Sequence, residues 1–501
     1  MEAALDTEQA GPRAIRGAGL RTLSFVAGGL LALASAPLLL RHLGVVDFGR
    51  YVTVVSLIAL VGGLTEGGLS LIGVREYATL PRPERNRFMR NLLGLRMVLS
   101  GAAVLIAVLF ALLAGYGAEM VMGTVVAGVG LLILSVQGTL AVPLNVNLNI
   151  GRQVAAELAR QVVTVILVVV LVLSAAGIVP LLAISIPTGL LLLGATVVFV
   201  RGSTSLIPSF ELGSWRQILR SAFPVAAATA VQTMYFRSVI IVMSLVAVDL
   251  QTGYFATSYR LLEVLLGIPV ILVGTTFPIL ARAAGRDRAR LVYATHRILE
   301  VGFLVGLGFA VCAALGAKPA ISLLAGPGSE PSVPVLRIQA ATLLLSFVST
   351  GCLFVLLSLE RYRGLLWASL AALVSTVAAA LLLVPAHQAI GGAIAAAIGE
   401  VVLMVALFVT LFGPEADLRP SLGFVPKALL AAAVGAGLPL LLSLPDIADV
   451  LAFAVVYAMV LMVIGAIPWE LRHALEERIR EHRRRPRRKP DRARSDGDGA
   501  A

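Results

Sequence analysis

The sequence predicts an all-α polytopic membrane protein with about fourteen transmembrane helices. Of its 501 residues, 58% are hydrophobic and only 14% are charged, whereas soluble domains are about half apolar and a quarter charged. The mean hydropathy is +0.94, and Arg-rich segments alternate with loops that contain no Arg or Lys. Because water does not solvate so much apolar surface, little mass is expected outside a bilayer.

A transmembrane helix needs about 20 mostly apolar residues to cross roughly 30 Å of hydrocarbon. Runs of this kind predict spans near 20–43, 51–74, 92–115, 120–143, 162–178, 180–200, 222–247, 254–281, 298–316, 335–358, 364–384, 389–412, 428–444 and 449–468. The turns that connect the two predicted spans within 162–200 and within 428–468 are short, so these pairs are the least clearly separated.

The distribution of Arg predicts the orientation. Arg residues gather after even-numbered spans, for example from Arg75 to Arg90 after the second and from Arg282 to Arg297 after the eighth. The loops 115–119 and 248–253, which follow odd-numbered spans, contain none. Because positive charge stays on the cytoplasmic side, we expect a bacterial inner-membrane protein with both termini in the cytoplasm. The same rule accounts for the net charge of +12, so nucleic-acid binding is not expected.

The segments between spans are too short for a catalytic domain. The longest exported one, 317–334, is expected to form a short irregular cap, and no GxxxxGK[ST] motif for ATP is present. Cys312 and Cys352 lie in apolar runs without a CxxC motif or a His/Cys cluster. We therefore expect no enzyme activity, no catalytic residue, no metal site and no bound cofactor.

The C-terminal segment 469–501 is basic, with a run of Arg interrupted by prolines. A basic cluster beside a membrane gains about 1 kcal/mol per charge at an anionic leaflet. The simpler interpretation is a disordered topology anchor.

Residues 43–51 and 245–255 resemble each other: each joins two apolar helices through a short acidic–Gly–aromatic turn. About two hundred residues separate them, which predicts two six-helix bundles related by a pseudo-two-fold axis along the membrane normal. Chance similarity is the alternative. The predicted organisation is a cytoplasmic N-terminus (1–19), an N-terminal bundle (20–201), a cytoplasmic linker (202–221), a C-terminal bundle (222–412), two additional helices (428–468) and a basic tail (469–501).

Several segments together resemble a known family. They are Leu43–Tyr51, Thr65–Ser70, Val74–Ala78, Arg220–Pro224, Val248–Glu263 and Thr276–Arg282. With them the chain resembles the bacterial Wzx-type polysaccharide flippases and the lipid II flippases of the MOP (multidrug/oligosaccharidyl-lipid/polysaccharide) superfamily. The resemblance covers about residues 15 to 410, without a single diagnostic motif. Wzx-like proteins often carry an acid in the seventh span, where this chain has Arg237.

The candidates among the ionisable residues inside predicted spans are Glu66, Arg237, Arg260, Glu263 and Glu400. Charges there are costly unless they face the bundle interior or water, so each is a candidate functional residue. Arg260 and Glu263 are three residues apart and share a helix face, so an ion pair between them is the alternative. Arg237 has no partner nearby in sequence, and we expect its partner to come from another helix or from a ligand.

The resemblance implies roles for these charges. Lipid II flippases use arginines in a central cavity for the substrate diphosphate, which the planar guanidinium binds in a bidentate manner. The arginines to which we assign this role are Arg237, Arg260, Arg50 and Arg41. Glu66 and Glu263 are candidates for binding a coupling cation or relaying a proton, although ion pairs between the two halves explain them equally well.

The expected function is therefore a flippase that moves a polyprenyl-diphosphate-linked oligosaccharide across the membrane by alternating access. Polysaccharide polymerase or glycosyltransferase machinery is a further candidate partner. The main alternative is a cation-coupled drug antiporter of the MATE branch, which favours acidic cavity residues. Two further hypotheses are an integral-membrane glycosyltransferase and a scaffold that acts through the basic tail.

Overall fold

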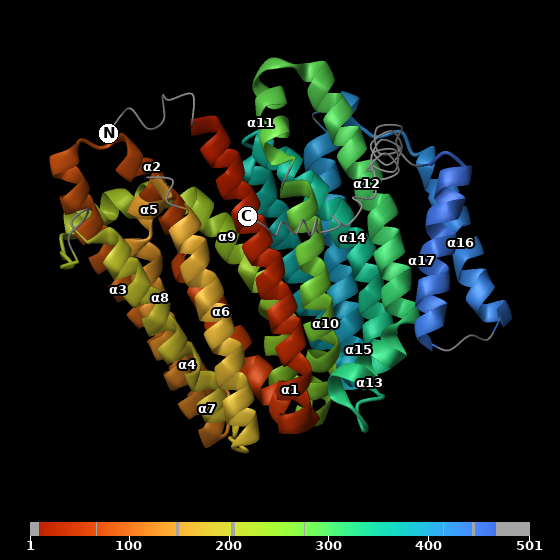
Figure 1. Cartoon of the computed structure of the whole chain (residues 1–501), viewed down its shortest axis with the longest axis horizontal. Coiled ribbons are helices and arrows are strands. Elements are labelled where there is room, and N and C mark those ends of the chain that lie inside the picture. The colour runs from red at the N-terminus through yellow and green to blue at the C-terminus, as the bar shows by residue number, and fades with distance from the viewer. Residues whose placement is uncertain are drawn as a thin grey trace, which may run out of the picture.

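A computed structural model describes residues 10–66, 68–146, 150–201, 206–274, 276–413, 415–442 and 446–466. Within these ranges the regular structure is helical and no strand is present. Ten helices are long and apolar enough to cross a membrane. Two of them are kinked and provide two spans each, and two shorter apolar helices follow. The all-α class and the prediction of about fourteen spans are thus confirmed (Figure 1).

The helices of the first half are α1 (Ala10–Glu66), α2 (Leu69–Thr79), α3 (Arg82–Leu113), α4 (Ala118–Leu140), α5 (Val142–Val146), α6 (Ile150–Leu173), α7 (Ile178–Ala183) and α8 (Ser185–Val200). The kink in α1 lies at Gly44, whose φ of 72° and ψ of 174° only glycine adopts without strain. This kink separates the first two spans.

The helices of the second half are α9 (Leu212–Val246), α10 (Asp249–Gly274), α11 (Phe277–Arg286), α12 (Arg288–Leu315), α13 (Ala317–Ala325), α14 (Ser332–Ser358) and α15 (Tyr362–Phe412). The kink in α15 is at Gln388. Beyond it lie the 3-10 helix η2 (Ala416–Leu418), α16 (Phe424–Leu442) and α17 (Asp446–Val463).

Some predicted boundaries were wrong. The segment 317–334 is not wholly irregular, because α13 occupies its first half. The third and fifth spans begin about ten residues earlier than expected, at Arg82 and Ile150. Long helices continue into the interface when their charged side chains reach water, and hydropathy alone misses these ends. The tail 469–501 lies outside the described residues.

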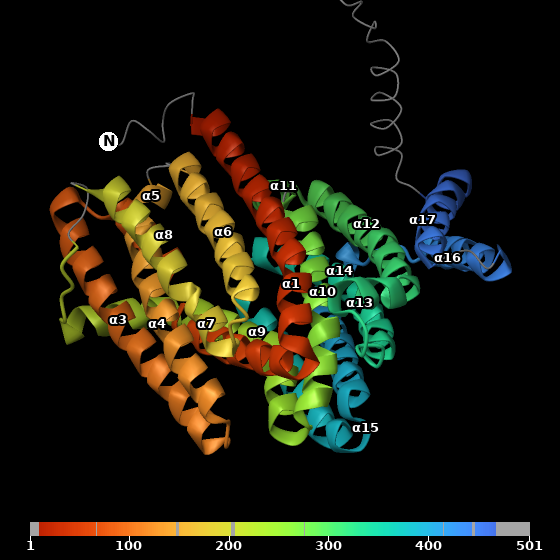
Figure 2. The same cartoon turned by 60° about the horizontal axis from the view of Figure 1, so that its bottom comes forward.

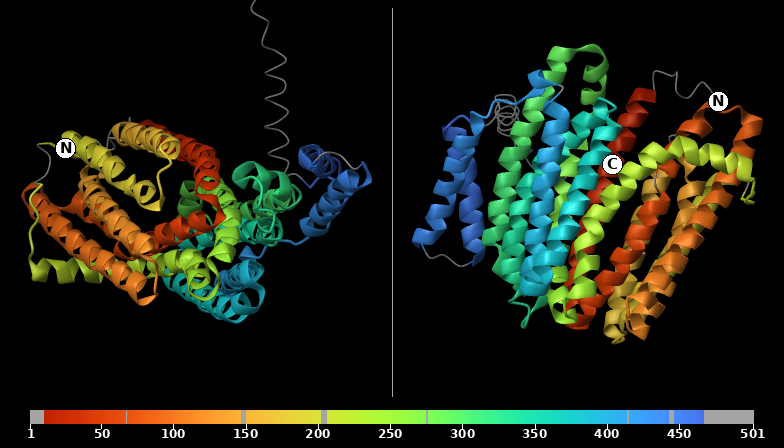
Figure 3. Two further views of the ribbon diagram at one scale, coloured as in Figure 1. Left: turned by 90° about the horizontal axis from the view of Figure 1, so that it is seen from below. Right: turned by 180° about the vertical axis from the view of Figure 1, so that it is seen from behind.

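Helix α9 connects the two halves (Figures 2 and 3). At its start, Ile218 and Ala222 pack with Leu69 of α2 and Leu92 of α3 in one buried cluster. Further along, Tyr235 packs with residues of α14 and α15. The predicted linker 202–221 therefore contains the first turns of a membrane helix. Movement of the two halves as rigid bundles, as alternating access requires, stays a prediction.

The pair α16 and α17 packs against α12 at the edge of the molecule (Figure 1). The Tyr457 hydroxyl donates to the Leu304 carbonyl at 2.8 Å. A Cβ added to Gly308 would lie 3.0 Å from the Tyr457 ring, so the glycine provides room for it. In lipid, such small residues and interhelical hydrogen bonds hold helices together.

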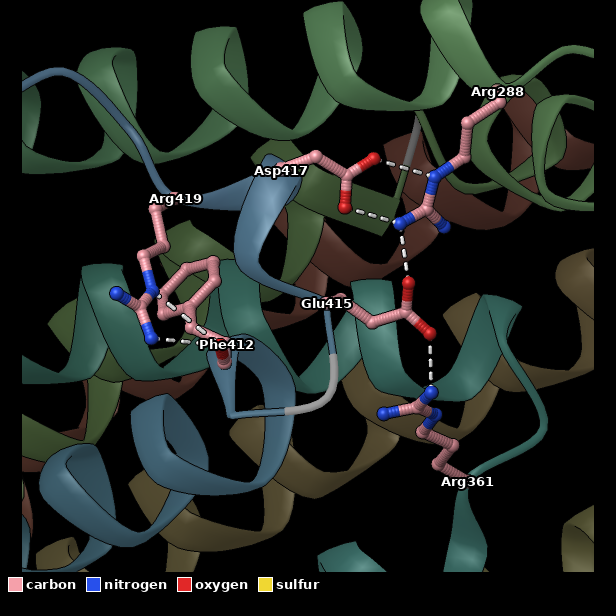
Figure 4. A network of polar contacts seen from close by, with 6 residues as sticks. All are labelled: Arg288, Arg361, Phe412, Glu415, Asp417 and Arg419. Atoms are coloured by element: carbon pink, nitrogen blue, oxygen red, sulfur yellow. Dashed lines mark hydrogen bonds and ion pairs between the residues drawn. The ribbon is translucent and has the colours of Figure 1, made fainter.

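An ion-pair network on the face that carries the Arg-rich loops, hereafter the inner face, anchors the segment after α15 (Figure 4). Arg288, at the start of α12, donates from Nε to Asp417 at 2.8 Å and also pairs with Glu415. Glu415 pairs in addition with Arg361, at the turn before α15. This inner-face network therefore ties together the starts of α12 and α15 and the chain that leads to α16.

The pH dependence of this network follows from Asp417. Hydrogen bonds from Arg288 hold the pKa of the Asp417 carboxyl below its usual range. A lowered pKa adds stability above the unfolded-state value of about 3.9, and this stability is lost as the pH falls through the folded-state value. We expect Asp417→Asn to lower Tm by a constant amount between pH 8 and pH 5, with the difference from wild type shrinking only below about pH 4 and vanishing below the folded-state pKa. A difference that disappears already at pH 6 would contradict this assignment.

Candidate functional site

A cavity of about 730 Å³ lies within the first half and reaches the interface with α10. Most of its wall is apolar and comes from α1, α4, α6, α7 and α8. The charged residues that line it are Glu66 of α1, Arg160 of α6 and Arg260 of α10. Gln161, Thr164, Ser185 and Thr188 add amide and hydroxyl groups. Cations from both halves thus line one cavity that also offers neutral hydrogen-bonding groups.

Arg237 and Arg260, two of the four arginines predicted to bind diphosphate, are brought together by Glu263. Nη2 of Arg237 donates to Oε1 of Glu263 at 2.8 Å, and Nη1 of Arg260 donates to Oε2 at 2.9 Å. The three side chains are 22%, 31% and 31% exposed. The partner of Arg237 is thus a residue of the next helix, and the group has a formal charge of +1.

Arg50 lies at the end of the molecule opposite the inner face, which we name the outer end, and it pairs across the two halves. Its Nε and Nη2 donate to Oδ2 of Asp249 at 2.9 and 2.7 Å, and its Nη1 donates to Asp47 at 3.2 Å. A Cβ on Gly49 would lie 2.8 Å from Cα of Gly253, and one on Gly253 would lie 2.2 Å from the carbonyl oxygen of Val45. The two repeated turns therefore meet in backbone contact, which we name the outer contact.

The outer contact lies outward of the cavity. Gly253 is seven residues before Arg260, or about 10 Å along α10 at 1.5 Å per residue. Tyr116 and Ser244 add a hydroxyl–hydroxyl contact of 2.6 Å between the two halves at the same end. In this structure, α1 and α10 are therefore in backbone contact between Arg260 and the outer face.

Arg41 does not join the other predicted arginines. Its Nη2 donates to the Leu323 carbonyl at 2.6 Å, at the C-terminal end of α13, where carbonyl groups attract a cation. It lines a separate, mostly apolar cavity of about 690 Å³ beside α12 and α17. The diphosphate role assigned to Arg41 and Arg50 stays a prediction.

Glu400 is buried in the second half, only 5% exposed. The Tyr235 hydroxyl donates to its Oε2 at 2.6 Å. A carboxyl group buried so deeply is costly when charged, and it is suited to binding a proton or a cation. Within the described ranges, no three His, Cys, Asp or Glu side chains lie together as metal ligands.

Two charged residues of the site were missed by the sequence reasoning. Arg96 falls inside the predicted third span, and the rule that marks other intramembrane charges should have selected it. It forms an ion pair with Glu66. Arg160 was placed in a loop, but it lies three turns into α6, with Nε 3.1 Å from both carboxylate oxygens of Glu157. The i, i+3 spacing of Glu157 and Arg160 was the signal that could have found it.

Comparison with known proteins bears on this arrangement. The family model described as "Polysaccharide biosynthesis protein" matches residues 38–334, more than half of the chain. The chain belongs to this family. The match includes both repeated turns, the charged residues of the cavity and the Arg237–Glu263–Arg260 group. No curated protein is similar enough in sequence to be matched.

Solved structures show which fold this chain has. It is similar to "Lipid II flippase MurJ, inward closed conformation", with a TM-score of 0.75 and 14% identity over 88% of this chain and 98% of that one. A multidrug resistance MATE transporter in an inward-facing conformation gives a TM-score of 0.64 and 15% identity, over 78% and 94% of the two chains. A MOP-superfamily transporter from Pyrococcus furiosus gives 0.53 and 16%, over 80% and 93%. At these identities the likeness shows the MOP-superfamily fold.

Proposed function

We propose that this protein is a flippase that moves a polyprenyl-diphosphate-linked oligosaccharide across the bacterial cytoplasmic membrane. The observation that carries the proposal is the composition of the 730 Å³ cavity: Arg160 and Arg260 come from opposite halves, next to amide and hydroxyl groups. Guanidinium groups match the geometry and charge of a diphosphate, and hydroxyl and amide groups match sugar hydroxyls. The family description, which concerns polysaccharide biosynthesis, supports the same substrate class.

In the proposed mechanism, the diphosphate–sugar head group enters the cavity from the inner side while the polyprenyl chain stays in lipid. The head group competes with Glu263 for Arg260, because a diphosphate offers more acceptor oxygens than one carboxylate. Separation of Arg50 from Asp249 and of Gly49 from Gly253 then opens the outer side. We propose that both termini lie in the cytoplasm and that the basic tail contacts the anionic leaflet.

A cation-coupled antiporter of the MATE type is the second candidate. Buried Glu400 and the cavity carboxylate Glu66 favour it, because acidic groups bind protons, coupling cations and cationic drugs. The same carboxylates are compatible with a flippase that uses an ion gradient. The two functions differ in the substrate: the arginines suit an anionic diphosphate lipid, and the carboxylates suit an organic cation.

The test uses purified protein in liposomes that carry a fluorescent polyprenyl-diphosphate sugar on one leaflet. We expect wild type to move this lipid and Arg260→Ala to slow it by about tenfold or more, since a charged hydrogen bond contributes about 1.5–3 kcal/mol. Arg87→Ala is the matched control: it removes the same charge from the inner surface, where the side chain is 74% exposed. Its rate should equal that of wild type.

The antiporter is tested in the same vesicles with a fluorescent organic cation and an imposed proton or sodium gradient. Gradient-driven movement of the cation, without movement of the lipid, would replace the flippase proposal. If lipid moves equally fast in wild type and in Arg260→Ala, Arg260 does not bind the transported lipid.

A further inference from the structure

The second span is broken at its inner end. Helix α1 ends at Glu66, and Gly68, with φ 72° and ψ −2°, precedes α2, which starts at Leu69. This left-handed conformation favours glycine. A Cβ on Gly68 would lie 2.9 Å from Cγ1 of Val225 on α9. The break therefore lies where the first half contacts the helix that leads into the second.

Arg96 of α3 contacts both sides of this break. Its guanidinium pairs with Glu66 before the break, and its Nη1 donates to the Ser70 hydroxyl after the break at 2.9 Å. The Arg96 side chain is only 2% exposed. On the α4 side, a Cβ on Gly138 would be 3.7 Å from Nη2 of Arg96. One buried cation thus connects the end of α1, the start of α2 and the body of α3.

Glu66 has a second environment. Its side chain is 53% exposed and lines the cavity that Arg260 also lines. The carboxylate therefore faces the cavity on one side and Arg96 on the other. Because a guanidinium donates along fixed directions in one plane, the contacts of Arg96 with Glu66 and Ser70 fix the carboxylate and the start of α2 relative to each other.

We propose that Arg96 is a positioning residue that holds the Glu66 carboxylate in the cavity and α2 against α9. When Glu66 is neutralised or binds a cation in the cavity, Arg96 is left buried without its carboxylate. A buried charge that loses its partner destabilises the arrangement. Movement of α2 relative to α9 then lets Arg96 leave this unfavourable buried position. The consequence for transport rests on the proposed function, whereas the restraint on α2 does not.

The restraint on α2 is tested first, by thiol labelling in a background with Cys312→Ala and Cys352→Ala. Ile72→Cys reports on α2, and Ala103→Cys on α3 is the matched control, because these two residues are 6% and 5% exposed. We expect Arg96→Gln to raise the labelling rate of the cysteine in Ile72→Cys about tenfold, through local opening. The labelling rate of the cysteine in Ala103→Cys should not change. Glu66→Gln should have the same selective effect, and Arg96→Lys a smaller one.

Two results of the labelling would overturn the proposal. Equal acceleration at both positions would mean that Arg96 supports the whole half rather than α2. No acceleration at Ile72 would mean that α2 is held without Arg96. Both outcomes are independent of any transport activity.

Transport then tests the consequence for function, with Arg96→Gln and Glu66→Gln made singly and together. If Arg96 acts through Glu66, each single variant slows lipid movement by about tenfold and the double variant is no slower than the slower single one, since coupled residues are non-additive. Multiplicative losses would show that Arg96 acts separately from Glu66. Wild-type protein that moves no lipid would contradict the proposed function, while the labelling result would still decide the role of Arg96.

Discussion

Replacing Gly253 with alanine is expected to open the outer contact and to abolish most transport. The added Cβ would lie 2.2 Å from the Val45 carbonyl oxygen and 2.8 Å from the carbonyl carbon. Both atoms belong to the backbone, so no side-chain rotation relieves the clash and α10 must move away from α1. Overpacking of this kind costs about 1–3 kcal/mol, which weakens the conformation in which the outer side is closed.

The measurement is the labelling of Thr53→Cys in the background without other cysteines. Thr53 is 1% exposed, and its hydroxyl donates to the Gly49 carbonyl, directly beneath the outer contact. We expect Gly253→Ala to accelerate its labelling by about tenfold, as 1.4 kcal/mol corresponds to a factor of ten. Gly117→Ala, at the same end but with no atom within 4 Å of the added Cβ, should have no effect. If the cysteine of Thr53→Cys stays unreactive in Gly253→Ala, the added methyl group is accommodated without separation of α1 from α10.

The second large effect is expected from Glu263→Gln. The substitution leaves Arg237 and Arg260, which are 22% and 31% exposed, without the carboxylate that bridges them. Removing one partner of a buried ion pair costs about 3–5 kcal/mol, and the partial exposure of this group places the expected loss near the lower end. We therefore expect Tm in detergent to fall clearly. Glu119→Gln, at an exposed position in the first turn of α4, is the control and should leave Tm unchanged.

Glu263→Gln also separates the two candidate functions. A flippase with both arginines released should bind the polyprenyl-diphosphate lipid more tightly and release it more slowly, so KM and the turnover rate should both fall. In an antiporter, the loss of the carboxylate should weaken binding of the transported cation. The polyprenyl-diphosphate lipid should not be transported by wild type or by the variant. An unchanged KM for the lipid would argue against competition between Glu263 and the substrate.

Much of the architecture could be predicted because hydropathy and charge distribution are local properties. The spans around 120–143 and 335–358 agree with α4 and α14 within a few residues, since long apolar runs are stable only as helices in lipid. Helix ends were predicted less well. Arg160 was expected in a loop, although it lies on a helix and lines a cavity inside the protein. Hydropathy does not distinguish the two settings.

The sequence alone determined that the chain crosses a membrane many times, that its cationic loops alternate with bare ones, and that two similar turns recur about two hundred residues apart. These properties depend on composition and spacing along the chain. The tertiary structure decided which charges meet: Arg237 with Glu263, Glu66 with Arg96, and Arg50 with Asp249. The Arg50–Asp249 pair joins residues separated by 199 positions, and the other two also join different helices, so their contacts depend on how helices pack in three dimensions. Sequence patterns identify charges inside a membrane, whereas packing determines their partners.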